Sequence, residues 1–374
     1  MGRPFSPQFI VEQLDRFVVG QERAKKDLAI LGFYQAMRQQ LDKQRYEDIV
    51  EEMWEKQYPN ASDTQEVQVS YNADGSVAGY GVTEPKYKQI ESIQKKYDVF
   101  DHLQKEEPSL PGKAGLILGP SGCGKTYLVT LLGKILDLPV VYVNAMELTN
   151  TGYVGRTISD ICDDELRSLA RTHEFGPWQM PYAIIFVDEF DKRCVSADER
   201  SWDRAIQYSL LAGLEGKTMS DTSSKGSSSV ETKRMLWILG GSFQHLRDIK
   251  HKTSTTIGYT GNIDPSKDDF HVYSAADLEE GGIIKEVAGR LPVVTEVIQL
   301  TREQMRDALK KENNSIKPYE DLYNFLGKQF LPTEEQIERI IDKCMESKTG
   351  ARGLSFAIHE VFKEDLLDLE YPIK

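Results

Sequence analysis

The sequence predicts an α/β fold in which a parallel sheet is flanked by helices and followed by a small C-terminal helical domain. Three observations predict it. Short apolar segments alternate with helical ones between residues 112 and 299, and a glycine-rich phosphate-binding sequence directly follows the first of them. From residue 300 to residue 374, charged and apolar residues alternate at helical spacing.

Length and composition fit a large and a small globular domain. The 374 residues exceed what one core usually organises, and 40% of them are hydrophobic. The 59 Asp and Glu outweigh the 46 Lys and Arg, for a formal net charge of −13. This surface repels phosphate backbones, and no long basic cluster compensates, so we expect no nucleic-acid partner.

The cysteines and the apolar runs indicate a cytoplasmic protein. Four scattered cysteines form no CxxC pair, which argues against a zinc site and against a disulfide framework. No apolar run approaches the roughly 20 residues that span a bilayer, so we expect no membrane partner.

Residues 1–45 are expected to start the large domain, with an amphipathic helix over 21–45. Residues 46–111 differ. An acidic helical piece ends at Pro59, and "VQVSYNADGSVAGYGV" then has the alternation and central turn of a hairpin. No recognisable chemistry follows, so residues 46–111 are interpreted as an inserted acidic helix/hairpin module.

The core over 112–299 carries four strand candidates. They read "AGLILG", "LPVVYVNA", "YAIIFVDE" and "RMLWILGG", and strands that are apolar on both faces are typical of parallel sheets covered by helices. The Ser-rich residues 217–233 lie between the third and the fourth and have little to bury, so we expect a mobile loop there.

A phosphate-binding loop is the clearest chemical signal. "GPSGCGKT", Gly119 to Thr126, matches G-x-x-x-x-G-K-[ST] between an apolar strand and a helical run. Its backbone N–H groups would surround the phosphates of ATP, Lys125 would add a charge, and Thr126 would offer its hydroxyl to Mg²⁺. A glycine-rich turn without a ligand is the alternative, which the strand–loop–helix context disfavours.

Two carboxylates end the strand in "IIFVDEFDK". Asp188 is placed to hold a hydrated Mg²⁺, and Glu189 can polarise a water toward the γ-phosphate. Two adjacent acidic residues at a strand end are, without other motifs, more often simply solvated. Together with the phosphate-binding loop, the pair predicts ATP hydrolysis.

Two arginines each have two interpretations. Arg290, in "VAGRLPVV", either caps a helix that stops before Pro292 or is an arginine finger for a nucleotide held by a neighbouring subunit. Arg352, in "TGARGLSF", lies near a helix start, where its charge opposes the helix dipole. An anionic partner such as the ATP phosphates would explain that position.

With these motifs assembled, the chain resembles the ClpX branch of the AAA+ ATPases, in the Clp/HslU group. "FVVGQERAKKDLA" is similar to that family's N-terminal nucleotide box, and "LGGSF", "GRLPVV" and "TGARGL" follow in the family's order. The resemblance implies an AAA+ P-loop NTPase large domain with a small C-terminal helical lid domain. It also implies a homo-oligomeric ring, expected to be a hexamer, that acts on protein substrates.

The resemblance assigns roles residue by residue. It puts Val18 and Val19 against the adenine, makes Ser242 part of the first sensor, Arg290 the finger acting in trans and Arg352 the second sensor. "LGGSF" lacks the Asn or Thr typical of other branches. The residues implied to contact ATP are Val18, Val19, Pro120, Ser121, Gly122, Cys123, Gly124, Lys125, Thr126, Tyr127, Asp188, Ser242 and Arg352.

The resemblance also gives "TGYVG" a role. In these unfoldases the loop after the second strand projects an aromatic and an aliphatic residue into a central channel, which here are Tyr153 and Val154. A rigid amphipathic ring suits varied peptide side chains, and flanking glycines let the loop move. The alternative is a tyrosine that folds back onto the core from an ordinary turn.

Three departures separate the chain from the family pattern. No cysteine pair matches its zinc-binding N-terminal domain, so the inserted module either replaces that domain or is decoration. Residues 217–233 lack the family's basic Arg-Lys-His triplet, so we do not expect its usual degradation tags to be recognised. "TTIGYTG" puts Ile257, Gly258 and Tyr259 where a peptidase-docking tripeptide would stand, with a tyrosine hydroxyl that costs ~1 to 3 kcal/mol if buried unpaired.

The function predicted is an ATP-driven ring that unfolds proteins by pulling them through a central pore, with a peptidase ring as an optional partner. One alternative is a stand-alone remodeller of a specific complex, with the inserted module choosing the client. A nucleic-acid motor or loader is a second, which the acidic charge opposes. A small-molecule P-loop kinase is a third, and it would need neither a finger in trans nor a channel loop.

Overall fold

The chain folds into two compact units, residues 1–35 with 112–374, and residues 36–111. The computed structural model describes residues 4–58, 67–71, 77–82, 86, 88–90, 110–149, 156–172, 174–175, 179–194, 201–223, 226–248, 272–311, 315–347, 352–367 and 369.

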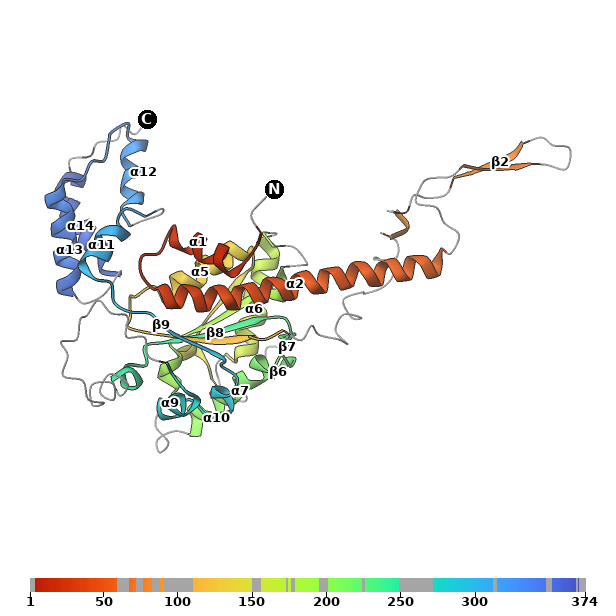
Figure 1. Cartoon of the computed structure of the whole chain (residues 1–374), viewed down its shortest axis with the longest axis horizontal. Helices are drawn as coiled ribbons and strands as arrows, with labels where there is room; N and C mark the ends of the chain where they lie inside the picture. Colours follow the sequence, from red (N-terminus) through yellow and green to blue (C-terminus); the bar gives the residue numbers. More distant parts are fainter. Residues whose placement is uncertain are drawn as a thin grey trace. The chain divides into compact units, whose positions relative to one another are not determined.

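A five-stranded parallel sheet forms the centre of the larger unit and confirms the predicted α/β class. Its strands are short, and most of their side chains are buried because helices cover both faces (Figure 1). In spatial order they are β4 (Val140–Asn144), β5 (Ile184–Asp188), β8 (Leu236–Gly241), β3 (Ala114–Leu118) and β9 (Val293–Glu296). The first four match the predicted strand segments.

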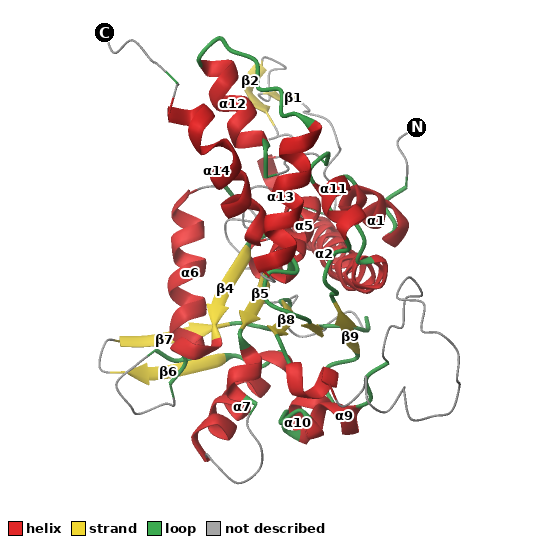
Figure 2. Ribbon diagram, turned by 90° about the vertical axis from the view of Figure 1, so that its left-hand side faces the viewer, coloured by secondary structure: helices red, strands yellow, loops and turns green. Residues whose placement is uncertain are grey.

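Helices pack on the two faces of the sheet in two groups (Figure 2). One group consists of α1 (Pro7–Asp15), the first part of α2 (Glu22–Gln57) and α5 (Lys125–Leu136). The other consists of α6 (Ile158–Thr172), α7 (Ser201–Leu214), α9 (Ala275–Glu280) and α10 (Lys285–Ala288). Three single-turn helices complete the connections: η1 (Ala145–Glu147), η2 (Met180–Tyr182) and η3 (Phe190–Arg193).

The C-terminal segment is helical, as predicted (Figure 1), and has its own apolar core. Met305, Ile340, Ile358 and Phe362 are buried within it. Its helices are α11 (Arg302–Ala308), α12 (Lys317–Phe325), α13 (Glu334–Ser347) and α14 (Arg352–Leu367). The domain boundaries after residues 45, 111 and 299 stay predictions.

The expected mobile loop over residues 217–233 is wrong. Strands β6 (Met219–Ser223) and β7 (Gly226–Val230) pair there in antiparallel register. Met219 and Val230 face each other across the hairpin and are each only 4% exposed, in the core beneath α6. The two apolar residues that end the Ser-rich run therefore fasten it, and the ladder between them needs only main-chain groups.

In the smaller unit, strands β1 (Val67–Tyr71) and β2 (Val77–Val82) pair in antiparallel register, as the alternating sequence predicts. Trp54 on α2 is buried, donates from Nε1 to Gln89 Oε1 at 2.8 Å and has the Lys86 ammonium 4.1 Å from its ring centroid. Helix α2 is continuous from Glu22 to Gln57, where two helical pieces were expected. None of the helices in the described part of the chain is long and apolar enough to cross a bilayer.

Candidate functional site

The phosphate-binding sequence forms a tight loop between β3 and α5. Gly119 has φ 147°, and a Cβ there would lie 2.2 Å from the Val297 carbonyl oxygen, so no other residue fits. Gly124 caps α5 with φ 91°, in the left-handed region that glycine tolerates. The loop is thus bent by backbone geometry alone, which leaves its N–H groups and the start of α5 free to meet an anion.

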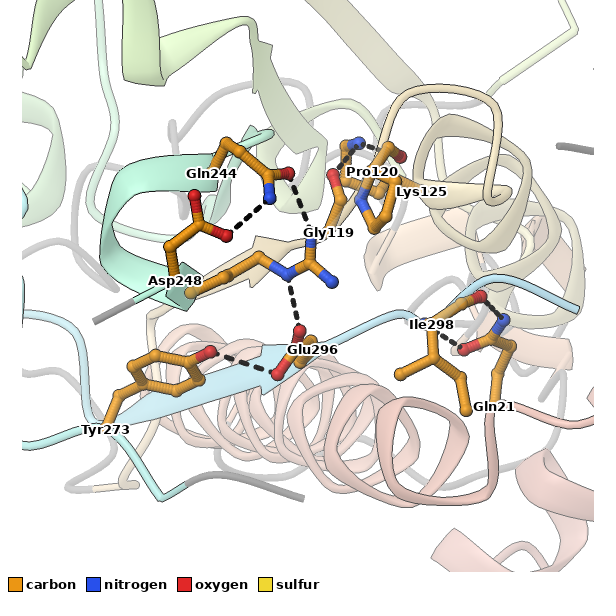
Figure 3. A network of polar contacts seen from close by, with 10 residues as sticks. Gln21, Gly119, Pro120, Lys125, Gln244, Asp248, Tyr273, Glu296 and Ile298 are labelled. Atoms are coloured by element: carbon orange, nitrogen blue, oxygen red, sulfur yellow. Dashed lines mark hydrogen bonds and ion pairs between the residues drawn. The ribbon is translucent and has the colours of Figure 1, made fainter. Parts of the chain in front are cut away.

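Lys125 is held inside this loop. Its ammonium donates to the carbonyl oxygens of Gly119 at 2.8 Å and Pro120 at 3.0 Å (Figure 3). Burial lowers the pKa of Lys125, and the nearby Asp188 carboxylate opposes that shift. A partly buried cation with only carbonyl acceptors would gain from a phosphate partner.

The two carboxylates at the end of β5 lie against the loop. Thr126 Oγ1 donates to Asp188 Oδ2 at 3.0 Å, and the Glu189 N–H donates to Asp188 Oδ1 at 2.8 Å. Glu189 has φ 56°, a left-handed conformation that is uncommon outside glycine and that often marks functional sites. Its side chain is exposed.

Thr126 and Asp188 fit a magnesium site. Mg²⁺ is usually held by one or two protein oxygens, with substrate phosphates and waters completing its shell. Elsewhere, the described residues contain no group of three or more His, Cys, Asp or Glu side chains that could hold a metal ion.

These groups line one cavity of about 550 Å³. We call two of its sides the sheet wall and the helical wall. The sheet wall comprises residues 121–127, 188–189, 191–192 and 241–242, and the helical wall comprises Leu300, Ala308, Ser315, Arg352 and Leu354. Val18 and Val19 add an apolar side. All the residues implied to contact ATP line this cavity except Pro120, whose carbonyl instead binds Lys125.

Arg352 is the first residue of α14, and its guanidinium reaches the phosphate loop. Nη1 donates to Ser121 Oγ at 3.1 Å. The charge of Arg352 also contributes to lowering the pKa of Lys125, after burial. Two cations therefore face the same space, which suits a polyphosphate.

Gln21 is a lining residue that sequence reasoning missed. It is 3% exposed, and its amide exchanges two hydrogen bonds with the Ile298 main chain, from Ile298 N at 2.9 Å and to Ile298 O at 2.7 Å (Figure 3). The N-terminal nucleotide segment is thereby attached to the chain between β9 and α11. Its place in "FVVGQ" was the only sequence signal.

A buried polar network supports the sheet wall from behind. Arg247 is 8% exposed and donates from Nε to Glu296 Oε1 at the end of β9, and Tyr273 OH donates to Glu296 Oε2 at 3.0 Å (Figure 3). Burial and the Glu296 charge raise the pKa of Tyr273, which keeps its hydroxyl protonated as a donor. The network attaches the segment after Ser242 to the sheet.

Arg290 lies outside the cavity. It follows the C-cap of α10, but its guanidinium pairs with Glu215 at 2.8 Å and is about half exposed. The helix-capping interpretation is therefore not what its side chain does here. Tyr153, Val154, Ile257, Gly258 and Tyr259 lie outside the described residues.

Comparison with known proteins finds similarity to one family of ATPases. Residues 115–264 match the ATPase family associated with various cellular activities (AAA). The chain is 29% identical over 273 residues to the ATP-dependent Clp protease ATP-binding subunit ClpX of Porphyromonas gingivalis, and 32% identical over 273 and 275 residues to those of Bacteroides thetaiotaomicron and Bacteroides fragilis. Each alignment covers 68% of this chain and 65–66% of the relative, so the chain spans just under two thirds of their length.

Proposed function

We propose that this chain, which matches the AAA family of ATPases and is similar to ClpX, is a cytoplasmic ATP-driven unfoldase, assembled as a ring, that pulls proteins through a central pore. One observation carries the proposal. The phosphate loop, the Asp188–Glu189 turn and Arg352 converge on a single cavity.

The cavity residues divide the chemistry of ATP hydrolysis among them. Lys125 and the loop N–H groups hold the β- and γ-phosphates, and Thr126 and Asp188 hold Mg²⁺, which neutralises phosphate charge when bound. Glu189 polarises the attacking water. Arg352 senses the phosphates from the helical wall, so that hydrolysis alters the angle of the helical segment. Val18 and Val19 pack on the adenine.

A ring of six subunits would place Arg290 of each subunit next to the nucleotide of its neighbour. In the described chain its side chain does not line the chain's own cavity, and it is exposed. It acts on the nucleotide of the next subunit, where it stabilises transition-state charge.

Tyr153 and Val154 supply the grip on the substrate. The described residues on either side of their segment lie close together, because the Thr149 N–H donates to the Arg156 carbonyl at 3.0 Å and Leu148 forms an isolated bridge with Arg156. The Arg193 guanidinium donates to the carbonyls of Ala145, Met146 and Leu148, and so holds the residues that precede this segment.

A stand-alone remodeller is the second candidate, and the compact unit of residues 36–111 favours it as a surface for choosing a client. Mixing the protein with a bacterial peptidase ring separates the two. Loss of stimulated degradation on Ile257→Ala supports delivery to a peptidase. Absence of any association excludes it and leaves the remodeller.

The unfoldase proposal is tested by single-turnover unfolding of a tagged fluorescent protein. Wild type with ATP is expected to unfold it, and Tyr153→Ala to fail while ATP hydrolysis survives. Tyr153→Phe keeps the aromatic side chain and serves as the matched control. If Tyr153→Ala unfolds as fast as wild type, the pulling loop is elsewhere.

A further inference from the structure

We propose that helix α7 mounts Arg290, and that Gln207 on this helix is the positioning residue that sets it relative to the Asp188–Glu189 turn. The proposal rests on the function above, in which Arg290 acts on the next subunit's nucleotide. It adds the device that connects each subunit's own site with the arginine it would lend to its neighbour.

Gln207 is a buried amide with all its hydrogen bonds directed at main chain. It is 1% exposed. Its Nε2 donates to the carbonyls of Arg193 at 2.7 Å and Gly282 at 3.0 Å, and its Oε1 accepts from the Ile284 N–H at 2.8 Å. A buried amide only has to satisfy its own donors and acceptor, and nearby groups of its own helix could do that. The Gln207 amide instead binds main-chain groups of two other segments, and so joins both of them to α7.

The first of these segments belongs to the nucleotide cavity. Arg193 ends η3, the single turn that directly follows Glu189. The same turn is held to α7 a second time, because Arg193 Nη1 donates to the buried Asp203 carboxylate at 3.1 Å. Because of these two connections, α7 is expected to move together with the turn that contains Glu189.

The second segment leads directly to Arg290. Ile284 is the N-cap of α10, and an unbroken series of main-chain hydrogen bonds runs from there to Arg290, whose N–H donates to the Val287 carbonyl at 2.9 Å. α7 and α10 lie side by side (Figure 2). Because Gln207 of α7 binds the Ile284 N–H, the place where α10 begins is set by α7, and the position of Arg290 follows from it.

Glu215 provides the second support. It continues the last turn of α7 and pairs with the Arg290 guanidinium at 2.8 Å. Gln207 and Glu215 are eight residues apart, about 12 Å along a helix. The Arg290 segment is therefore fixed at its start by a buried amide and at its guanidinium by a half-buried carboxylate, both carried by one helix and its last turn.

The test is complementation between subunits. Gln207→Met keeps the length of the side chain but leaves three main-chain partners unpaired, and its ATP hydrolysis is expected to fall about tenfold. Glu189→Gln subunits are inactive but keep an intact Gln207. In randomly mixed 1:1 rings, about a quarter of the sites have an intact Glu189 facing a correctly mounted Arg290, so the mixture should exceed the mean of its parents about fivefold.

A merely structural role, or action only on the subunit's own Glu189 turn, predicts a mixture equal to that mean and overturns the inference. Arg290→Ala mixed with Glu189→Gln is the control for the finger itself. If that control fails to recover, the proposed action in trans fails, and the inference falls with it. If only the Gln207→Met mixture fails, the inference alone is wrong.

Should Gln207→Met not fold, as judged by circular dichroism, Glu215→Gln replaces it because its pair is exposed. The same recovery is expected at smaller amplitude, with Glu303→Gln on α11 as the matched control. Hydrolysis by Glu215→Gln alone that equals wild type overturns the two-point mount.

Discussion

The sheet wall and the helical wall face the same cavity but are held in place very differently. The sheet wall is bent by glycines with positive φ, and the buried Arg247–Glu296 pair fastens it from behind. From the helical wall, Arg352 reaches the phosphate loop through one exposed side chain and one hydrogen bond. We infer that the chemistry needs the rigid wall, while a wall that contacts the phosphate loop through the side-chain hydrogen bond from Arg352 to Ser121 can respond to the bound nucleotide.

The largest effect is expected where the rigid wall is fastened. Arg247→Met leaves the Glu296 carboxylate buried with only Tyr273 as donor, and the free energy of unfolding should fall by about 3 to 5 kcal/mol. Urea denaturation followed by tryptophan fluorescence measures it. The double variant Arg247→Met/Glu296→Leu should recover most of the loss. A change under about 1 kcal/mol for the single variant would show that the pair does not fasten the wall.

Removing the loop cation should abolish chemistry without unfolding the protein. Lys125→Ala is expected to lower ATP hydrolysis about 10² to 10³-fold, because a preorganised charge is lost at the transferring phosphoryl group. Lys134→Ala, an exposed lysine on the same helix, is the control and should match wild type. Retained hydrolysis in Lys125→Ala would remove the phosphate loop from the mechanism.

A smaller, different effect is expected at the helical wall. Arg352→Ala should bind ATP nearly as well as wild type but hydrolyse it about tenfold more slowly, since one charge-assisted contact is lost. The ATP consumed per unfolded substrate should rise. Arg339→Ala on α13 is the control. An unchanged ratio of hydrolysis to unfolding would show that the helical wall does not respond to nucleotide.

The smallest effect concerns pH in the absence of nucleotide. Burial lowers the pKa of Lys125 below its ordinary value of 10.5. Between the lowered and the ordinary pKa, the unfolded chain binds the proton and the folded chain releases it, so the free energy of unfolding should rise with pH across this window. Lys125→Met should lack the rise. Thermal melting between pH 8 and pH 10.5 compares the two, and equal slopes would contradict burial as the cause.

The parts of the fold and site that the sequence predicted are those set by local patterns. Apolar runs of strand length, the glycine spacing before Lys125 and the acids ending "IIFVDE" each act within a few residues. The structure brings the predicted phosphate-loop residues and the two acids together at one edge of the sheet, because loops at the carboxyl ends of parallel strands meet there.

What the sequence did not predict depends on distant partners. Arg247 and Glu296 are charged, which by default indicates a surface, and only the fold makes them a buried pair. Gln207 looks like any polar residue of a helix. The hairpin of β6 and β7 was missed because its ladder uses main-chain groups, and only Met219 and Val230 signal its burial.

ATP hydrolysis in this cavity is expected to drive unfolding, and the variant Glu189→Gln separates the two events. Hydrolysis and the unfolding of a tagged fluorescent protein are followed in the same sample with Mg-ATP. Glu189→Gln should bind ATP like wild type, hydrolyse it about 10² to 10⁴-fold more slowly and slow unfolding by the same factor. Unfolding at the wild-type rate while hydrolysis is lost would contradict the claim.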